Sequence, residues 1–437
     1  MQDFNYWKKL HENETLEEFS NDTIGLLWLK TKSIIRKELI ADFVANNAIV
    51  LSETALAKQF VELFDLLCKD PANSHKFLDE YIKTENAKQV GNLDTKQLVS
   101  ELFKVKVFDW GGDYKNSLDK YLVKKYIKTI TPSYEILISK FEPEINVAVR
   151  GYVLNSWYNH WSSILIEHIF KSHKAVLPTV GQIKSVDFFI NDVPFDLKVT
   201  YLPVEYISFK RDEKYSKEAH AIALNYIEKH PIEYTKNNDK KKELMGIKKI
   251  LTKQKSKTEE LKTSLKLIKE SLGKCVELTY LKSEAIKSKI AFDKTASETN
   301  IYYEIVEKMK DRNDEFCTSV LTTLKNEKLE ILKKVQDNPK LLAKWLYENQ
   351  GEMRFGSENR MYLVLVDTDD FNSSWKLKRN LDLLKPNILT YLNDFKNKKI
   401  ADLKVEFNFK GKPQTFKALT DIIFVVKQTS VEKSTNA

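Results

Sequence analysis

Alternating apolar and polar residues between Ser185 and Thr200 predict two short β-strands joined by a tight turn. The turn falls at Asn191-Asp192, because both residue types tolerate the left-handed backbone of a two-residue hairpin loop. In that register Asp187 lies opposite Asp196. One face is then wholly apolar and consists of Val186, Phe188, Ile190, Val193, Phe195, Leu197 and Val199. The other face carries Asp187, Asp196 and Lys198, with Phe189 and Pro194 nearer the turn.

Apolar residues at helical spacing predict helices on the N-terminal side of this hairpin. Residues 1 to about 105 are mostly helical in this interpretation, with clear periodicity in Thr23–Phe43 and Ser52–Cys68. Val147–His173 is expected to form a long amphipathic helix, with Glu167 at the flank of its apolar stripe. That stripe consists of Leu154, Trp157, Trp161, Ile164, Leu165 and His168.

A long, highly charged segment with a helical pattern follows the hairpin. Within it, Lys241–Lys274 has apolar residues alternately four and three positions apart, which is typical of a coiled-coil-like seam. A second stretch, Asn300–Val335, completes a predicted antiparallel pair of long helices joined near Ser283–Ser297. Two functional interpretations stay open, a DNA-clasping arm and a dimer contact. Solvated helix faces in a lysine-rich protein are the simpler alternative.

Strand patterns return near the end of the chain. Met361–Val366 is a continuous apolar run that ends at Asp367, as a buried central strand would, and Lys404–Phe409 and Ile422–Val426 also predict strands. We therefore predict an α/β (α+β) protein with a mixed β-sheet core flanked by helices. The predicted regions are a mostly helical N-terminal region (1–146), the first part of the core (147–209), a helical insertion (210–345), the second part of the core (346–428) and a tail (429–437).

The composition is compatible with a polyanionic partner without being diagnostic of one. The 437 residues include 71 Lys or Arg and 62 Asp or Glu, a formal net charge of +9. Three scattered cysteines and no Cys/His cluster give no support to a disulfide framework or a structural zinc site. The charged N-terminus does not resemble a signal peptide, and no apolar run approaches transmembrane length. We therefore expect a cytoplasmic protein with no membrane partner.

The two opposed carboxylates of the hairpin are its chemically informative feature. In the predicted register the β-carbons of Asp187 and Asp196 lie roughly 4.5–5.5 Å apart, and like charges in that position are destabilising. A fold keeps such a pair more readily when a divalent cation lies between the carboxylates. Lys198, two residues further along the same face, would then lie beside the bound water or a substrate phosphate.

The string Asp187…Asp196-Leu197-Lys198 resembles the signature of the PD-(D/E)xK nuclease superfamily, which includes most type II restriction endonucleases. Val186 stands where the family often has proline. The resemblance implies that Asp187 and Asp196 hold Mg²⁺, with the backbone carbonyl of Leu197 completing the shell. It also implies that Lys198 activates or positions the attacking water. Glu167 matches, in kind and in order, a helix glutamate that often completes the metal shell; a solvated flank glutamate is the alternative.

The resemblance covers roughly residues 147–205 and 358–426 and implies a restriction-endonuclease-like core. The function expected from it is a Mg²⁺-dependent, site-specific DNA endonuclease of type II that cuts double-stranded DNA. A homodimer and a cognate DNA methyltransferase follow as expected partners. The alternatives are a less specific defence or repair nuclease of the same superfamily, and a non-catalytic nucleic-acid-binding protein.

Two further clusters are candidates for DNA contact. Gln350, Arg354 and Arg360 lie in a polar segment, and Arg and Gln side chains can read guanine and adenine by paired hydrogen bonds. They can equally bind phosphate or brace the loop. Three basic residues beside Trp375 are better suited to positioning phosphate; they are Lys376, Lys378 and Arg379.

Overall fold

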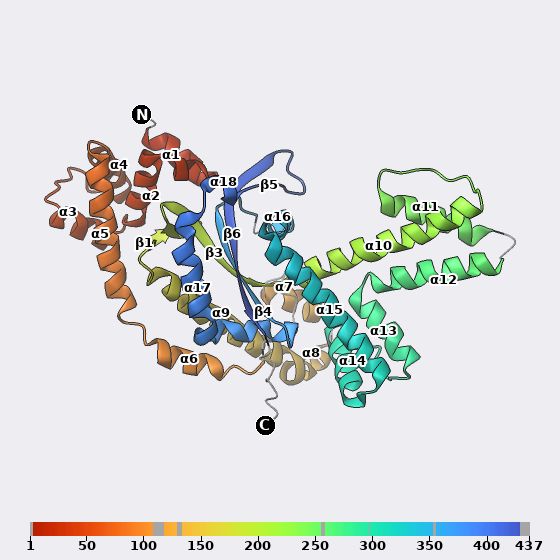
Figure 1. Cartoon of the computed structure of the whole chain (residues 1–437). Coiled ribbons are helices and arrows are strands. Elements are labelled where there is room, and N and C mark those ends of the chain that lie inside the picture. The colour runs from red at the N-terminus through yellow and green to blue at the C-terminus, as the bar shows by residue number, and fades with distance from the viewer. Residues whose placement is uncertain are drawn as a thin grey trace, which may run out of the picture. The chain divides into compact units, whose positions relative to one another are not determined.

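The computed structural model describes residues 3–107, 118–128, 133–254, 258–296, 298–352 and 355–428 (Figure 1). The chain divides into two compact units. Unit 1 comprises Met1–Tyr201 and Pro339–Ala437, and unit 2 is the intervening Leu202–Asn338. The boundaries of unit 2 fall close to the 210 and 345 expected for the helical insertion. The expected tail, 429–437, lies outside the described residues.

Unit 1 is built on a six-stranded mixed sheet, which confirms the predicted mixed α/β class. The strand order is β1-β2-β3-β4-β6-β5. The β1–β2, β2–β3 and β5–β6 pairs are antiparallel, whereas β3–β4 and β4–β6 are parallel. The strands are β1 (Val176–Ile183), β2 (Val186–Ile190), β3 (Val193–Tyr201), β4 (Arg360–Asp367), β5 (Lys404–Asn408) and β6 (Thr415–Lys427).

The β2–β3 hairpin has the predicted turn and register. Asn191 and Asp192 both adopt positive φ, +47° and +64°, as a type I′ turn requires. The paired residues are Phe188 with Phe195, Phe189 with Pro194, and Ile190 with Val193. The prediction of one apolar and one polar face is only partly right, because helices pack on both faces of the hairpin near the turn. Val186 and Phe189 pack into the N-terminal core, whereas Phe188, Ile190, Val193 and Phe195 pack against α9 (Asn146–Lys171) and α17 (Leu381–Asp394).

The N-terminal helices pack on β1 and the outer side of the hairpin, so they belong to the same unit as the sheet. The predicted helix Thr23–Phe43 is two helices, because Arg36 has an extended backbone (φ −135°, ψ 149°) that interrupts it. Aspartate side chains cap α2, α5 and α6. The helices of this region are α1 (Phe4–Glu12), η1 (Glu18–Asn21), α2 (Thr23–Ser33), α3 (Lys37–Asn46), α4 (Leu56–Leu67), α5 (Pro71–Val90) and α6 (Thr95–Phe103).

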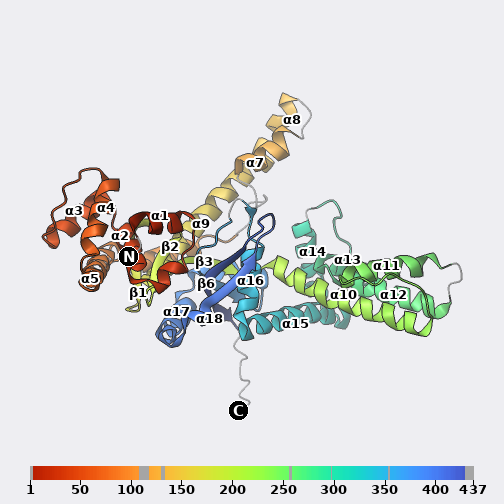
Figure 2. The ribbon, with the colours of Figure 1, turned by 90° about the horizontal axis from the view of Figure 1, so that it is seen from above.

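The long helix predicted over Val147–His173 is α9, but its buried side differs from the predicted stripe. Leu154 and Trp157 are 42% and 37% exposed. Tyr158 is buried instead, and its hydroxyl donates to the Trp375 carbonyl at 2.9 Å. The N-terminal half of α9 extends away from the sheet together with α7 (Leu118–Leu122) and α8 (Tyr134–Ser139) (Figure 2). Leu154 and Trp157 therefore stay exposed, because this half of α9 does not pack on the sheet.

The remaining elements of unit 1 complete the layers. α9 and α17 contribute Ile166, Phe170, Leu384 and Ile388 to one hydrophobic core on the sheet. The π-helices η2 (Val123–Ile127) and η3 (Phe141–Ile145) flank α7 and α8. The other elements are α16 (Pro339–Glu348), the 3-10 helix η5 (Phe371–Arg379), η6 (Phe395–Asn397) and α18 (Ile400–Leu403).

The described residues of unit 2 form helices joined by loops, but they do not form the predicted pair of long helices. Side-chain caps at Asp239, Thr258 and Asp314 divide the charged segment into shorter helices. Their apolar residues form two separate clusters, one among α10, α11 and α12 and one among α13, α14 and α15. The helices are α10 (Val204–Lys229), α11 (Lys240–Lys253), α12 (Glu259–Lys274), α13 (Glu277–Lys287), α14 (Glu298–Arg312) and α15 (Glu315–Asp337). None of the helices in the described part of the chain has the length and apolar character needed to span a membrane.

Candidate active site on the β2–β3 hairpin

The hairpin brings Asp187, Asp196 and Lys198 together. Asp187 Oδ2 accepts a hydrogen bond from the Leu197 backbone N–H at 2.7 Å, which ties the two strands together just beyond the Phe188–Phe195 pair. Lys198 Nζ lies 2.5 Å from Asp196 Oδ2. The Asp196 backbone N–H donates to the Asn359 carbonyl at 2.9 Å, so the site is also anchored to the segment that precedes β4.

Both carboxylates are withdrawn from water. Asp196 is only 9% exposed, and Asp187 is half-buried. Burial, and after it the charge of Asp196, raises the pKa of Asp187 to about 6, against the opposing hydrogen bond from Leu197. Burial also raises the pKa of Asp196 in spite of the adjacent Lys198. The site therefore holds more negative charge than its own lysine neutralises.

Glu167 reaches this site from α9. Its charge contributes to the raised pKa of Asp187, and the charge of Lys171 opposes it. Glu167 Oε2 and Lys171 Nζ form an ion pair at 2.9 Å, one helical turn apart. Glu167 therefore lies close enough to Asp187 for its charge to act on that carboxyl group. Direct contact between Glu167 and a metal stays a prediction.

Glu358 is a fourth carboxylate at the site, and the sequence interpretation missed it. It is 6% exposed, and its charge raises the pKa of Asp196. Arg360 donates to Glu358 Oε1 through Nε at 2.9 Å and Nη2 at 2.8 Å. Among the described residues, Glu358 Oε2 has no hydrogen-bond partner. Glu358 comes two residues before Arg360, which pairs with Asp196 in the parallel β3–β4 pair. That pairing is a tertiary feature, so the sequence alone gave no signal for Glu358.

The chemistry of the donor set fits Mg²⁺, which prefers carboxylate oxygens and retains several waters. Asp187 and Asp196 supply such oxygens in a partly dry, negatively charged site. Within the described residues, no cluster of three or more His, Cys, Asp or Glu side chains is arranged to hold a metal. A metal here would therefore rest on the two aspartates and water. Leu197 contributes its N–H to Asp187, and the role of its carbonyl stays a prediction.

The structure corrects the predicted base contacts of the polar segment. Arg360 is 6% exposed, bound to Glu358 and packed over the Tyr347 ring, with its guanidinium carbon 4.8 Å from the ring centroid. Gln350 bonds both the N–H and the carbonyl of Gly356 and also accepts from Arg360. These two side chains brace the loop, which was one of the open alternatives. Arg354 lies outside the described residues.

The basic cluster beside Trp375 is corrected in a similar way. Lys376 is exposed, as phosphate contact requires. Lys378 and Arg379 are each 6% exposed. Lys378 Nζ donates to Asn159 Oδ1 at 2.8 Å, and Arg379 Nη1 donates to backbone carbonyls at the end of α6. They hold η5 against α9 and α6 rather than facing solvent.

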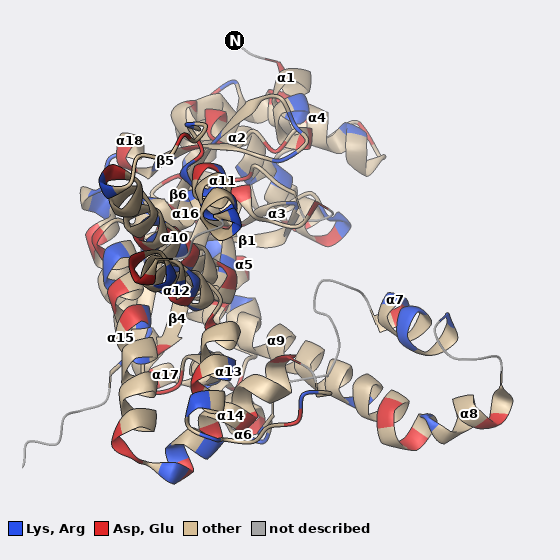
Figure 3. Cartoon of the chain, turned by 90° about the vertical axis from the view of Figure 1, so that its right-hand side faces the viewer, with Lys and Arg blue, Asp and Glu red and all other residues tan. Residues whose placement is uncertain are grey.

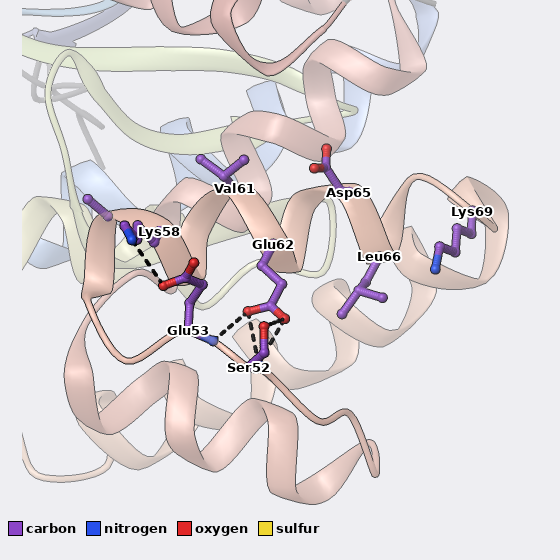
Figure 4. A pocket seen from close by; sticks show the side chains of 9 residues that line it. Ser52, Glu53, Lys58, Val61, Glu62, Asp65, Leu66 and Lys69 are labelled. Atoms are coloured by element: carbon purple, nitrogen blue, oxygen red, sulfur yellow. Dashed lines mark hydrogen bonds and ion pairs between the residues drawn. The ribbon is translucent and has the colours of Figure 1, made fainter.

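A cavity of about 560 Å³ lies along α4, apart from the predicted site residues (Figure 4). Its carboxylate Glu62 accepts from the Ser52 backbone at 2.8 Å, the Ser52 hydroxyl at 2.7 Å and the Glu53 backbone at 3.0 Å. These bonds hold the loop before α4 and lower the pKa of Glu62, the Ser52 hydroxyl contributing most. Glu62 therefore has a structural role in holding the loop before α4.

Comparison of the chain with protein-family models, with curated proteins and with solved structures finds no match in any of the three.

Proposed function

We propose that this protein is a Mg²⁺-dependent DNA endonuclease with a restriction-endonuclease-like core, resembling the type II enzymes. The observation that carries the proposal is the pair of like-charged carboxylates on one hairpin, buried Asp196 and half-buried Asp187, with Lys198 beside Asp196. Perturbed carboxylates of this kind concentrate at functional sites. The resemblance of Asp187…Asp196-Leu197-Lys198 to the PD-(D/E)xK signature supplies the reaction class.

In the proposed reaction, water attacks the phosphorus of a DNA phosphodiester and the P–O bond to the leaving oxygen breaks. Asp187 and Asp196 would hold Mg²⁺, which when bound supplies Lewis acidity toward the phosphodiester. Lys198 is 45% exposed at its side chain, so it can contact an incoming phosphate oxygen. The Lys198 ammonium, which is paired with Asp196, would offset negative charge developing on the phosphate.

Type II cleavage further implies a symmetric dimer, in which each subunit cuts one strand, and a cognate methyltransferase that protects host DNA. A less specific nuclease of the same superfamily would use the same residues. A non-catalytic DNA-binding protein would not require them, and that difference makes the alternatives testable.

The experiment incubates full-length protein with unmethylated plasmid and phage DNA, with and without Mg²⁺. The test variants are Asp196→Ala and Lys198→Ala. Asp192→Asn is the matched control: it changes an acid of the same hairpin, asparagine tolerates the turn, and the buried Lys30 keeps its second partner, Asp79, at 2.9 Å.

Discrete fragments that form only with Mg²⁺, are lost in Asp196→Ala and Lys198→Ala, and still form with Asp192→Asn would support the site-specific nuclease. A smear with the same requirements would support the less specific nuclease. Absence of cleavage on several unmethylated DNAs, by folded protein, would overturn the catalytic proposal.

A further inference from the structure

Helix α11 of unit 2 has an unusually one-sided charge. Its 14 residues include six lysines and a single glutamate, Glu243. Glu243 is 4% exposed and is bound to His220 at 2.9 Å and to Lys240 at 3.4 Å. The apolar residues Leu244, Ile247 and Leu251 pack toward α10 and α12. Because Glu243 and the apolar residues are buried, the exposed part of α11 is lysine-rich; Figure 3 colours the lysines along the chain blue.

Lys240, Lys241 and Lys242 of α11 pair with Glu243, Asp212 and Asp239. Among the described residues, Lys248, Lys249 and Lys253 have no carboxylate partner, as is also true of Lys266 and Lys269 on α12. Lys248 is half-buried, and Lys249 and Lys253 are exposed one turn apart. By contrast, Lys210, Lys287 and Lys308 each pair with a glutamate on their own helix, at 2.6 to 2.9 Å. The α11 trio thus keeps its positive charge available to a partner.

We infer that this lysine face, Lys248, Lys249 and Lys253, contacts the phosphate backbone of duplex DNA. Protein–protein interfaces are depleted in lysine and built on aromatic anchors, and Met245 is the one large apolar side chain of α11 that is exposed. Point charges repeated along a helix suit a regular polyanion, whose binding is driven by counterion release. Such contacts position DNA and read no sequence. The inference rests on the proposed function in taking DNA as the partner.

The test is a salt titration of DNA binding in the full-length protein carrying Asp196→Ala, which prevents cleavage. The probe is a fluorescein-labelled 30-base-pair unmethylated duplex, followed by anisotropy without Mg²⁺. The test variant adds Lys248→Gln, Lys249→Gln and Lys253→Gln. The matched control adds Lys210→Gln, Lys287→Gln and Lys308→Gln, which removes the same charge from the same unit; glutamine and lysine have similar helix propensity.

Each lost phosphate contact lowers the steepness of log K against log salt by about 1, so the α11 variant should lose about 2 to 3 in slope. The control trio should leave the slope nearly unchanged. Equal slope changes in the two variants, or none in either, would overturn the inference, because the effect would then reflect net charge or another surface.

The two proposals fail separately. If wild-type protein does not cleave DNA but the α11 variant selectively loses slope, the nuclease proposal fails and the α11 surface stands. If wild-type cleavage depends on Asp196 while the α11 substitutions leave DNA binding unchanged, the proposed DNA contact by α11 is wrong and the nuclease proposal holds. Circular dichroism and thermal unfolding of both triple variants confirm that the comparison is between folded proteins.

Discussion

Two buried carboxylate regions of this molecule are neutralised very differently. In unit 2, Glu327 is 7% exposed and is bound by the Arg211 guanidinium and the Tyr215 hydroxyl, with Lys214 Nζ at 3.4 Å. Arg211 also donates to the Lys274 carbonyl at 2.8 Å. On the β2–β3 hairpin of unit 1, Lys198 pairs with Asp196, whereas Asp187 has no ion-pair partner among the described residues. Burial raises the pKa of both carboxyl groups.

The structural ion network and the proposed Mg²⁺ site differ in how far the chain itself supplies partners for the buried carboxylates. Burying an ion is costly unless its partners replace the lost water. At Glu327 the chain supplies those partners, so the network is complete without a ligand. At the hairpin, Lys198 pairs with Asp196, and the neighbouring Glu358 pairs with Arg360, which leaves Asp187 as the carboxylate without an ion-pair partner among the described residues. We expect a bound cation to stabilise the site, as the proposed function requires.

The largest effect is expected where the complete network is broken. Arg211→Met leaves Glu327 as a buried charge without its main partner and should destabilise the protein by about 3–5 kcal/mol. Denaturant unfolding followed by circular dichroism measures the change. A loss below about 1 kcal/mol would show that Glu327 is solvated or protonated in the folded protein. Glu327 would then not be part of a complete ion network.

Lys378 is a buried lysine with no carboxylate partner among the described residues, so its effect on stability depends on pH. Burial lowers the pKa of Lys378 from 10.5 to about 8. Below pH 8 this lysine is protonated in both states, and the folded state bears the cost of the buried charge. Between pH 8 and 10.5 the unfolded chain holds more protons, so this group makes stability rise with pH, by about 3 kcal/mol in all.

The measurement is the free energy of unfolding from pH 7.5 to 10.5 for wild type and Lys378→Met, which removes the charge and keeps the length of the side chain. The difference between the two proteins isolates Lys378 from other titrating groups. Lys378→Met should be the more stable at pH 7.5, with the gap closing as pH rises. A constant gap would mean that Lys378 titrates normally.

Asp187→Asn tests the uncompensated charge at the site itself. Without metal, this substitution should stabilise the protein at pH 7.5 by about 2–3 kcal/mol, because it removes a buried charge whose pKa lies near 6 while keeping an acceptor for the Leu197 N–H. Thermal unfolding with and without about 10 mM MgCl₂ measures the stabilisation that Mg²⁺ gives when it binds the folded protein. Wild type should gain stability from Mg²⁺ and Asp187→Asn should not. Destabilisation by Asp187→Asn would contradict the proposed cost of the charge on Asp187.

The smallest expected effect concerns Glu358, which we treat as a positioning residue. Glu358→Gln keeps a hydrogen-bond acceptor for Arg360 and removes the charge next to Asp196. Loss of a supporting group of this kind typically costs about 10–100-fold in metal affinity or activity. The Mg²⁺ concentration that gives half-maximal cleavage should rise. Stability without metal should also fall, because the buried Arg360 loses its anionic partner, so cleavage is measured well below the unfolding temperature of the variant. An unchanged Mg²⁺ dependence would remove Glu358 from the site.

The sequence by itself determined the features that depend on neighbours along the chain. The Asn191-Asp192 turn, the register from Phe188 to Ile190 and the length of α9 follow from local backbone preference and periodicity. The proximity of Asp187, Asp196 and Lys198 follows from that hairpin alone. The mixed sheet also followed from its apolar runs, with β1 as the strand that was not predicted.

Only the tertiary structure decided which charged side chains are buried and what they meet. Arg360, Lys378 and Arg379 look in the sequence like surface groups for DNA, but the packing of β4 and η5 encloses them. Glu358 joins the site because β4 pairs in parallel with β3 across a long stretch of intervening chain. The exposed Leu154 and Trp157 of α9 show the same limit. Periodicity specifies one face of an element, whereas burial requires a partner surface, and distant segments supply that surface.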